Sequence, residues 1–278
     1  MNQPSEEYRH VWLVGASSGI GEALAKQLFR SGLPSRKHGR KVRLSLSARR
    51  EEVLARLVKD LVAESDDLTS ARSSGRVGYA PMDSTKEEEV RQAHSLIVKE
   101  RGPVDVLIYC TGINNGDRLI RDMSMEQVRH IVDTNFTGLM WCTLLVLPDM
   151  RAKAHGHIVG INSLASRRAV PKTGVYGSTK AAMTLFLDTL RIEEGHHGIH
   201  VTDVLPGFVD TPAIETLDHP KPFMITSEQA ASIILRGVAQ RKRTVGFPWL
   251  IDWLTWLSML FVPFFIWAFL FRRVLALC

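Results

Sequence analysis

Two side chains in the second half of the chain have the types and spacing for proton transfer. Tyr176 and Lys180 are four residues apart, which on a helix places them on one face, one turn apart. A tyrosine with its ordinary pKa of about 10 is a poor acid or base at neutral pH, and a neighbouring ammonium group lowers that pKa. Ser163 precedes them, and its hydroxyl could hold a substrate carbonyl group. A Tyr-Lys pair is also common on helix surfaces, so the spacing alone leaves both interpretations open.

A glycine-rich turn follows the first apolar segment and has the sequence Gly15-Ala-Ser-Ser-Gly-Ile-Gly21. Glycines here let the backbone approach a ligand without a Cβ clash. The helix that begins at this turn directs free N–H groups towards a phosphate. A position directly after a strand favours dinucleotide binding over a plain turn. The residues predicted to hold the cofactor here are Gly15, Ser17, Ser18, Gly19, Ile20 and Gly21.

The end of the second apolar segment distinguishes between two cofactors. An enzyme that uses NAD places an acidic residue there to bind the ribose 2′-hydroxyl, whereas this chain has Arg49 and Arg50. A guanidinium group binds a 2′-phosphate that a carboxylate would repel. We therefore predict NADP(H), bound by Arg49 first and Arg50 second. The alternative for both arginines is a solvated helix start.

Apolar segments alternate with helical patterns along most of the chain. Strands are predicted at 10–16, 41–48, 76–82, 104–110, 157–161, 200–205 and 244–247, and helices at 20–32, 51–62, 86–100, 125–151, 176–194 and 227–240. This alternation predicts βαβ units and a parallel sheet, and the continuous apolar runs indicate a sheet covered on both faces. The predicted fold class is α/β, a single doubly wound Rossmann-like parallel sheet followed by an apolar C-terminal helical segment.

These motifs occur in a defined order between residues 8 and 248. In chain order they are Gly15-Ala-Ser-Ser-Gly-Ile-Gly21, Asp83, Asn135, Ser163, Tyr176, Lys180 and Pro206-Gly-Phe-Val-Asp-Thr211. With this set the chain resembles the classical short-chain dehydrogenase/reductase family.

The resemblance implies a role for each matching residue. Tyr176 would be the catalytic acid or base, Lys180 would lower its pKa and bind the nicotinamide ribose, and Ser163 would polarise the carbonyl. Asn135 would hold a water of the proton relay. The resemblance thus implies the catalytic residues Asn135, Ser163, Tyr176 and Lys180, with further cofactor contacts at Asp83, Gly112, Tyr176, Lys180, Pro206, Gly207, Val209 and Thr211.

The chain departs from the family pattern after the fourth predicted strand. The family usually has Asn-Asn-Ala-Gly there, and this chain has Tyr109-Cys-Thr-Gly112. Gly112 preserves the backbone turn, but the asparagine that braces the central sheet is missing. Other groups must therefore satisfy the backbone N–H and C=O groups of this segment.

Substrate contacts are expected around Ser163 and in the stretch after Thr211. Leu164, Phe208 and Met224 would form an apolar wall beside Ser163, compatible with a lipid, steroid, retinoid or fatty-acyl carbonyl compound. The alternative is that these residues simply pack beneath a loop. Arg167 and Arg168 could meet an anionic head group or lie on a solvated loop. No metal site is predicted.

The C-terminal segment differs sharply from the rest of the chain. Residues 254–271 carry no charge, and at about 1.5 Å per residue in a helix they approach the thickness of a bilayer core. Tryptophans cluster at one end and Arg272-Arg273 follow the other, a pattern typical of membrane segments. Membrane attachment through residues 249–271 is predicted, either as a span kinked at Pro263 or as a hairpin in the interface. The alternative is a buried helix that covers a dimer partner or the substrate cleft.

Composition and charge exclude several classes of protein. The 278 residues are 45% hydrophobic and 23% charged, which is typical of a globular chain. Three cysteines cannot form a disulfide framework, and the first residues contain no apolar signal segment. A net charge of +6 does not by itself indicate nucleic acid. We predict a catalytic NADP(H)-binding domain at 1–248 and a membrane-attachment segment at 249–278.

Together these patterns predict an NADPH-dependent reductase that transfers hydride to a ketone or aldehyde on an apolar substrate, with Tyr176 as general acid. One alternative is the reverse reaction, oxidation of a hydroxysteroid or lipid alcohol by NADP. Another is a non-catalytic NADP(H)-sensing scaffold at a membrane. The resemblance also implies a homodimer or homotetramer. The catalytic domain is expected on the cytoplasmic side, where NADPH is available.

Overall fold

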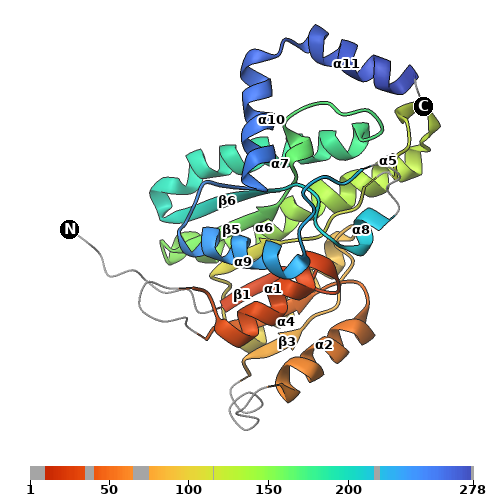
Figure 1. Ribbon diagram of the computed structural model, residues 1–278. Helices are drawn as coiled ribbons and strands as arrows, with labels where there is room; N and C mark the ends of the chain where they lie inside the picture. The colour runs from red at the N-terminus through yellow and green to blue at the C-terminus, as the bar shows by residue number, and fades with distance from the viewer. Residues whose placement is uncertain (1–9, 35–40, 65–74, 115, 216–219, 277–278) are drawn as a thin grey trace.

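A computed structural model describes residues 10–34, 41–64, 75–114, 116–215 and 220–276. Figure 1 shows one central sheet with helices on both sides. Its seven strands are all parallel, in the order β3-β2-β1-β4-β5-β6-β7. The order reverses between β1 and β4, which creates a crevice at the carboxyl ends of the strands. In chain order the strands are β1 His10–Val14, β2 Arg43–Ser47, β3 Val77–Tyr79, β4 Val106–Tyr109, β5 Gly156–Ile161, β6 Ile199–Pro206 and β7 Thr244–Phe247.

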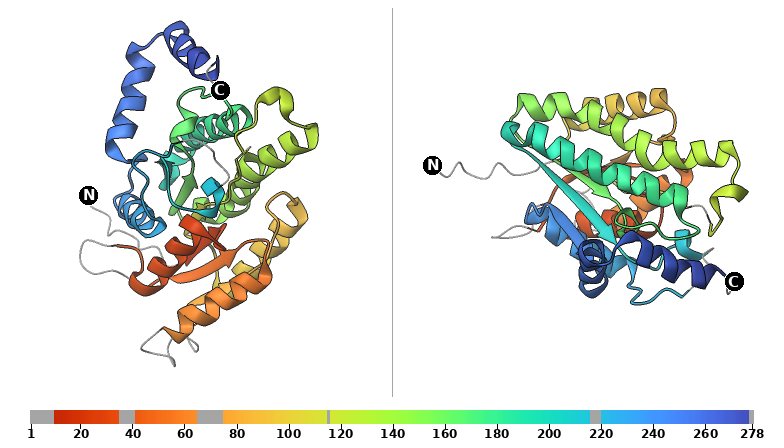
Figure 2. Two further views of the ribbon diagram at one scale, coloured as in Figure 1. Left: turned by 45° about the vertical axis from the view of Figure 1, so that its right-hand side comes forward. Right: turned by 90° about the horizontal axis from the view of Figure 1, so that it is seen from above.

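The sheet is buried on both faces, as the continuous apolar runs predict. In β1, Val11 and Leu13 belong to one apolar core, and Trp12 and Val14 belong to the other. Helices α1 (Gly19–Ser31), α2 (Glu51–Ala63) and α9 (Ser227–Ala239) cover the first face. Helices α4 (Glu87–Arg101), α6 (Gly138–Ala152) and α7 (Gly174–Glu194) cover the second (Figure 2). The prediction of a doubly wound α/β sheet is therefore confirmed.

The long helix predicted at 125–151 has a local defect. The chain forms α5 (Met125–Val132), then a π-helical turn at Asp133–Thr137, then α6. A π-turn inside a helix changes the direction of the side chains that follow, and such turns occur frequently at functional sites. Here the π-turn contains Asn135, one of the residues that the family resemblance singles out.

The apolar C-terminal segment forms two helices, α10 (Trp249–Phe261) and α11 (Phe264–Ala276). Pro263 separates them, and Figure 1 shows α11 turning away from the end of α10. Among the described residues, the one helix long and apolar enough to cross a membrane is 125–152, and it packs its buried side chains against the sheet. Each C-terminal helix has 13 residues, or about 20 Å, too short for a bilayer core of about 30 Å. Whether the segment spans a membrane with a kink at Pro263 or lies in the interface as a hairpin stays a prediction.

Candidate active site

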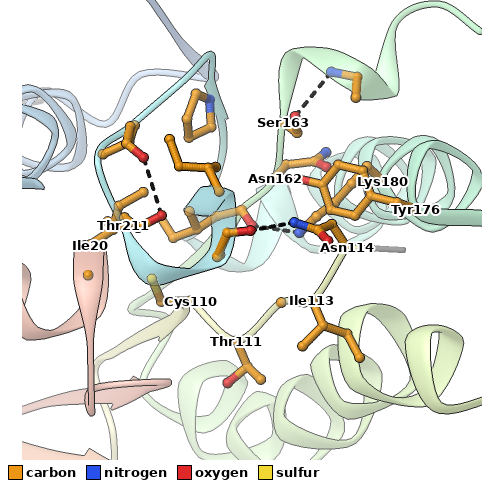
Figure 3. A pocket seen from close by; sticks show the side chains of 18 of the residues that line it. Ile20, Cys110, Thr111, Ile113, Asn114, Asn162, Ser163, Tyr176, Lys180 and Thr211 are labelled. Atoms are coloured by element: carbon orange, nitrogen blue, oxygen red, sulfur yellow. Dashed lines mark hydrogen bonds between the residues drawn. The ribbon is translucent and has the colours of Figure 1, made fainter. Parts of the chain in front are cut away.

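A cavity of about 570 Å³ lies at the carboxyl ends of the strands, where the strand order reverses. Figure 3 shows Ser163, Tyr176 and Lys180 on one side of it and Ile20 and Thr211 on the other. The glycine-rich turn after β1 lines the same space. The fold thus brings the proposed proton-transfer residues and the proposed phosphate turn to one cavity.

Tyr176 and Lys180 face each other from one side of α7. The Lys180 Nζ atom lies 5.7 Å from the centroid of the Tyr176 ring. Burial raises the pKa of Tyr176 above its ordinary value, and a hydrogen bond with Ser163 opposes the increase without cancelling it. The sequence led us to expect Lys180 to lower this pKa, but the protein alone leaves Tyr176 as a neutral phenol.

The Lys180 ammonium group is itself buried, with 2% of the residue exposed. Among the described residues it donates to the Ile161 carbonyl oxygen at 3.0 Å and contacts Met183 Sδ at 3.5 Å. Burial lowers the pKa of Lys180 to about 8. Electrostatic interactions with Cys110 and Asp203 act in the opposite direction and raise it. One of its three N–H groups remains for a ligand hydroxyl in the cavity.

Asn162 and Asp203 form a polar layer beneath Lys180 that the sequence did not reveal. Asn162 Nδ2 donates to Thr184 Oγ1 at 2.8 Å and to Asp203 Oδ1 at 3.1 Å. Thr184 Oγ1 donates in turn to Asp203 Oδ2 at 2.9 Å. Burial raises the pKa of Asp203 to about 6, partly offset by these hydrogen bonds. The layer links β6 to α7 through Asp203 and Thr184 and keeps a carboxylate near the Lys180 ammonium.

Asn135 lies behind the cavity rather than on its described surface. Its Oδ1 atom accepts from the Ile113 N–H at 2.8 Å, and its Nδ2 atom donates to the Ile113 carbonyl at 2.9 Å and to Thr179 Oγ1 at 3.0 Å. These bonds occupy both N–H groups of the side-chain amide. The segment that lacks the family's asparagine is therefore braced from the π-turn. The role of Asn135 in a proton relay stays a prediction.

Tyr109 completes this brace from the end of β4. Its hydroxyl donates to the Thr134 carbonyl at 2.6 Å, and a Cβ at Gly138 would lie 2.4 Å from the Tyr109 oxygen. Gly112 similarly faces Lys180, because a Cβ there would lie 3.3 Å from Nζ. The unusual Tyr109-Cys-Thr-Gly112 segment thus anchors the π-turn and keeps a glycine beside the lysine.

The glycine turn has the geometry of a phosphate cradle. Gly15 and Gly19 have φ values of +90° and +53°, which favour glycine. A Cβ at Gly21 would lie 1.9 Å from the Gly15 carbonyl oxygen. Ser18 is the N-cap of α1, but its side chain forms no capping hydrogen bond. The first N–H groups of α1 therefore stay available to an anion in the cavity, and Ser17, Ile20 and Ser18 line that part of it.

Both arginines after β2 line the cavity, and both are exposed. Arg50 Nη2 donates to the Ser17 carbonyl at 3.3 Å and to Ser17 Oγ at 3.2 Å. Burial would raise the pKa of Asp83, but hydrogen bonds from Thr85 and the charge of Arg49 hold that pKa below its ordinary value. Arg50 thus contacts the glycine turn through Ser17, although the sequence favours Arg49 as the first ligand of a 2′-phosphate.

The remaining predicted residues divide between the two sides of the cavity. Pro206, Gly207, Val209 and Thr211 line it from the end of β6, and Asn114 Nδ2 bonds across its mouth to the Ala213 carbonyl at 2.5 Å (Figure 3). Leu164 and Phe208 line the same cavity as Ser163, and their contact with a substrate stays a prediction. Met224 is 47% exposed and does not belong to the described lining, so the structure does not support its predicted contact. Residues 216–219 of the same stretch lie outside the described residues.

Three further lining residues come from the C-terminal helices, Ile251, Thr255 and Trp267. Nothing in their spacing indicated that they would reach this cavity. Arg167 and Arg168, expected on an anion or in solvent, contact these helices instead. Only the long-range packing of the tail onto the segment after Ser163 creates this part of the site.

The model of the family described as short chain dehydrogenase matches residues 9–222, more than two thirds of the chain. The chain belongs to the short chain dehydrogenase family. Among its relatives in this family is an uncharacterized oxidoreductase of Myxococcus xanthus (strain DK1622), 31% identical over 242 residues, 87% of this chain and 88% of that protein. Short-chain reductase protein NovJ of Streptomyces niveus is 32% identical over 208 residues, 74% of this chain and 71% of that one. This short chain dehydrogenase is therefore an oxidoreductase.

A solved structure of another family member shares the fold of this short chain dehydrogenase. A short-chain dehydrogenase from Sphingobium yanoikuyae, in complex with NADPH, superimposes with a TM-score of 0.72 at 23% identity. The alignment covers 92% of this chain and 96% of that one. The fold similarity extends beyond residue 222, where the family match ends.

Proposed function

We propose that the protein is a membrane-attached, NADPH-dependent reductase of a ketone or aldehyde on an apolar molecule. The observation that carries this proposal is the shared cavity, which Tyr176, Ser163 and Lys180 line together with the glycine turn. The apolar side chains of Leu164, Phe208 and the C-terminal helices surround the space beside Ser163.

The residues present fit a dinucleotide with a 2′-phosphate. The glycine turn leaves the N-terminal N–H groups of α1 for the pyrophosphate, and Arg49 and Arg50 line the part of the cavity beyond it. No acidic residue occupies the end of β2, where a carboxylate would favour a free ribose hydroxyl. NADPH is also the ligand in the Sphingobium yanoikuyae structure. Bound NADPH would supply the hydride that the carbonyl carbon accepts.

The protein's own residues would then move the proton. Ser163 Oγ and the Tyr176 hydroxyl would hold the substrate oxygen, and Tyr176 would donate its proton as charge develops there. The raised pKa of Tyr176 keeps the phenol protonated at neutral pH, which suits an acid. Oxidation of an alcohol would instead use Tyr176 as the base, and the comparison of the two directions described below tests which reaction the protein performs.

The cofactor preference is tested by binding. Arg49→Ala and Arg50→Ala should each weaken NADPH binding by about tenfold or more, because a charge-assisted bond to phosphate contributes about 1.5–3 kcal/mol. NADH binding should stay unchanged. Arg56→Ala is the control, since Arg56 is exposed on the same helix α2 and does not belong to the described lining. Equal losses for both nucleotides, or a preference for NADH in the unmodified protein, would contradict the assignment.

The direction is tested by comparing NADPH plus a carbonyl compound with NADP plus the matching alcohol at neutral pH. Faster oxidation than reduction, after correction for the equilibrium constant, would favour the alcohol dehydrogenase alternative. Tight NADPH binding without turnover across a broad panel of carbonyl compounds would favour the non-catalytic scaffold.

We propose that residues 1–248 form the catalytic part, on the cytoplasmic side, and that residues 249–278 attach it to the membrane.

We also propose a homo-oligomer formed through α6 and α7, since Leu144, Leu185 and Ile192 of these helices are exposed by 64%, 70% and 81%. Leu185→Glu should lower the molar mass measured by light scattering in detergent. If the unmodified protein already has the molar mass of one chain, the proposed oligomer is excluded.

A further inference from the structure

The segment directly after Ser163 is tied to both C-terminal helices. Arg167 forms an ion pair with Asp252 at 2.7 Å and donates to the Asp252 carbonyl at 2.6 Å and to Thr255 Oγ1 at 3.1 Å. All of these contacts fix α10. The Arg167 side chain is 13% exposed, so this is an internal link rather than a surface ion pair.

The next residue fixes the second helix. Arg168 Nη2 donates to the Val262 carbonyl at 2.6 Å, and its guanidinium group lies 4.7 Å from the centroid of a Trp267 ring. The Trp267 indole N–H donates back to the Ala169 carbonyl at 2.7 Å. Two consecutive arginines thus hold α10 and α11 against the catalytic segment, which carries Ser163.

These links bring the inner faces of the two helices into the active-site cavity. Ile251 and Thr255 of α10 and Trp267 of α11 line the same cavity as Tyr176. Leu164 and Arg168 line this cavity as well, and Figure 1 shows α10 and α11 beyond α7, away from helix α1, which follows the glycine turn. A dinucleotide on the glycine turn would leave this apolar part of the cavity for the substrate.

The outer faces of the same helices are apolar and exposed. Asp252 is the sole acidic residue after position 248, and it points inward to Arg167. No charge therefore interrupts the outer surface before the exposed Arg272. The large apolar side chains there, each 43% to 74% exposed, are Trp249, Trp253, Leu254, Trp256, Met259, Leu260, Phe261, Phe264, Phe265, Ile266 and Phe269.

A bilayer interface fits this surface better than water or a second protein chain. An uncharged apolar face of this extent is unfavourable in water. The tryptophans and the flanking Arg272 match the composition of membrane interfaces, and helices of about 20 Å lie in an interface rather than span it. The inner face of these helices lines the cavity, and the composition of their outer face matches that of a lipid-facing surface.

We infer that α10 and α11 form a lipid-facing wall of the substrate site, through which an apolar carbonyl compound dissolved in the bilayer enters. Ile251, Thr255 and Trp267 form the subsite for its apolar part, and Arg167 and Arg168 hold that subsite beside Ser163. This inference rests on the proposed reductase function and adds the source of the substrate and the residues that select it.

The first test measures substrate selection with two aldehydes, one long-chain and held in phosphatidylcholine vesicles, one short and water-soluble. Trp267→Ala should lower the ratio of kcat/KM for the long over the short aldehyde by about tenfold or more, since contacts to apolar groups differ by such factors. Met125→Ala, a variant at an apolar residue 91% exposed on α5, should leave the ratio unchanged. Equal losses for both aldehydes, or no change, would overturn the subsite.

The second test measures entry from lipid. The double variant Phe264→Ser/Phe265→Ser alters two outward residues of α11, 68% and 71% exposed. A smaller fraction of this variant should rise with the vesicles in a flotation assay. The ratio of its reduction rate with aldehyde in vesicles to its rate with aldehyde in detergent micelles should also fall. A ratio equal to that of the unmodified protein would overturn entry through this wall. Near-ultraviolet circular dichroism of each variant confirms that the fold is retained.

The same measurements distinguish a failure of the reductase function from a failure of the lipid-facing wall. If the unmodified protein reduces neither aldehyde with NADPH, in vesicles or in micelles, the reductase function is wrong. If it reduces both and the variants leave the ratios unchanged, the reductase function stands and the lipid-facing wall is wrong.

Discussion

The cavity has two sides that are built in different ways. The nucleotide side, formed by the turn Gly15–Gly21 and the end of β2, is made by neighbours in sequence and by backbone geometry. The tail side, formed by α10 and α11, is held by side chains from a segment more than 80 residues earlier in the chain. The nucleotide side is therefore specified by local sequence, whereas the tail side depends on tertiary packing.

This difference suggests a division of labour. The nucleotide side would bind a ligand with fixed chemistry, and a Cβ at Gly21 would already collide with the Gly15 carbonyl. The tail side presents apolar side chains that can change without disturbing the sheet, so it can adapt to a particular substrate. Tyr176 and Lys180 lie between the two sides on α7, where both ligands would meet.

The largest effect is expected where the two sides meet. Tyr176→Phe should lower kcat by about 10²–10⁴-fold, because general acid catalysis contributes such factors. NADPH affinity should stay within the error of the measurement, since the ring and its packing remain. Steady-state kinetics and a fluorescence titration of NADPH check both expectations. Turnover at the unmodified rate would remove Tyr176 from its assigned role.

The next largest effect tests the rigidity of the nucleotide side. Gly21→Ala places a Cβ 1.9 Å from the Gly15 carbonyl oxygen, so the turn must shift and its N–H groups move away from the phosphate. We expect NADPH binding to weaken by about tenfold or more, since each lost hydrogen bond to a charged group is worth about 1.5–3 kcal/mol. The matched control is Gly195→Ala, because no atom lies within 4 Å of a Cβ there. Isothermal titration calorimetry compares the two variants. Equal affinity would show that the turn does not constrain the cofactor.

A smaller effect tests whether the tail belongs to the same cooperative unit. Arg167→Ala should lower the free energy of unfolding by about 2 kcal/mol, the typical value for hydrogen bonds to charged groups. A double-mutant cycle with Asp252→Ala should show coupling between the two sites. Urea titrations followed by tryptophan fluorescence provide the values. Additive effects would mean that residues 249–278 fold independently of the catalytic part.

The smallest effect concerns the sheet that supports both sides. Burial lowers the pKa of His10 to about 4 from 6.5. The unfolded chain therefore takes up the proton first, and stability present above pH 6.5 is lost as the pH falls towards 4. His10 alone should cost about 1 kcal/mol between about pH 7 and pH 5.5. His10→Gln should flatten this pH dependence, whereas His130→Gln, at an exposed residue, should not.

The contrast between the two sides also explains what the sequence could predict. The α/β sheet followed from alternating apolar and helical segments, and the residues of the glycine turn followed from their types and order. The structure brings Ser163, Tyr176 and Lys180 to one cavity, because helix periodicity and strand ends fix where such residues lie.

The features that escaped prediction depend on contacts distant in sequence. The π-turn at Asp133–Thr137 is a backbone detail that periodicity does not report. The contacts of Arg167 and Arg168 depend on where the tail packs. The raised pKa of Tyr176 depends on burial, which spacing to Lys180 cannot show. The basic pair Arg167-Arg168 and the lone Asp252 in an apolar tail were the sequence features that could have indicated this contact.

The central claim is that this cavity transfers hydride to a carbonyl carbon while Tyr176 supplies the proton. The most direct measurement uses NADPH carrying deuterium at C4, an apolar aldehyde in vesicles and ordinary water, with mass spectrometry of the alcohol formed. The account predicts one deuterium on the former carbonyl carbon for each NADPH oxidised, from one C4 face only, and almost none with Tyr176→Phe. Oxidation of NADPH without deuterium in the alcohol, or undiminished transfer in the variant, would contradict it.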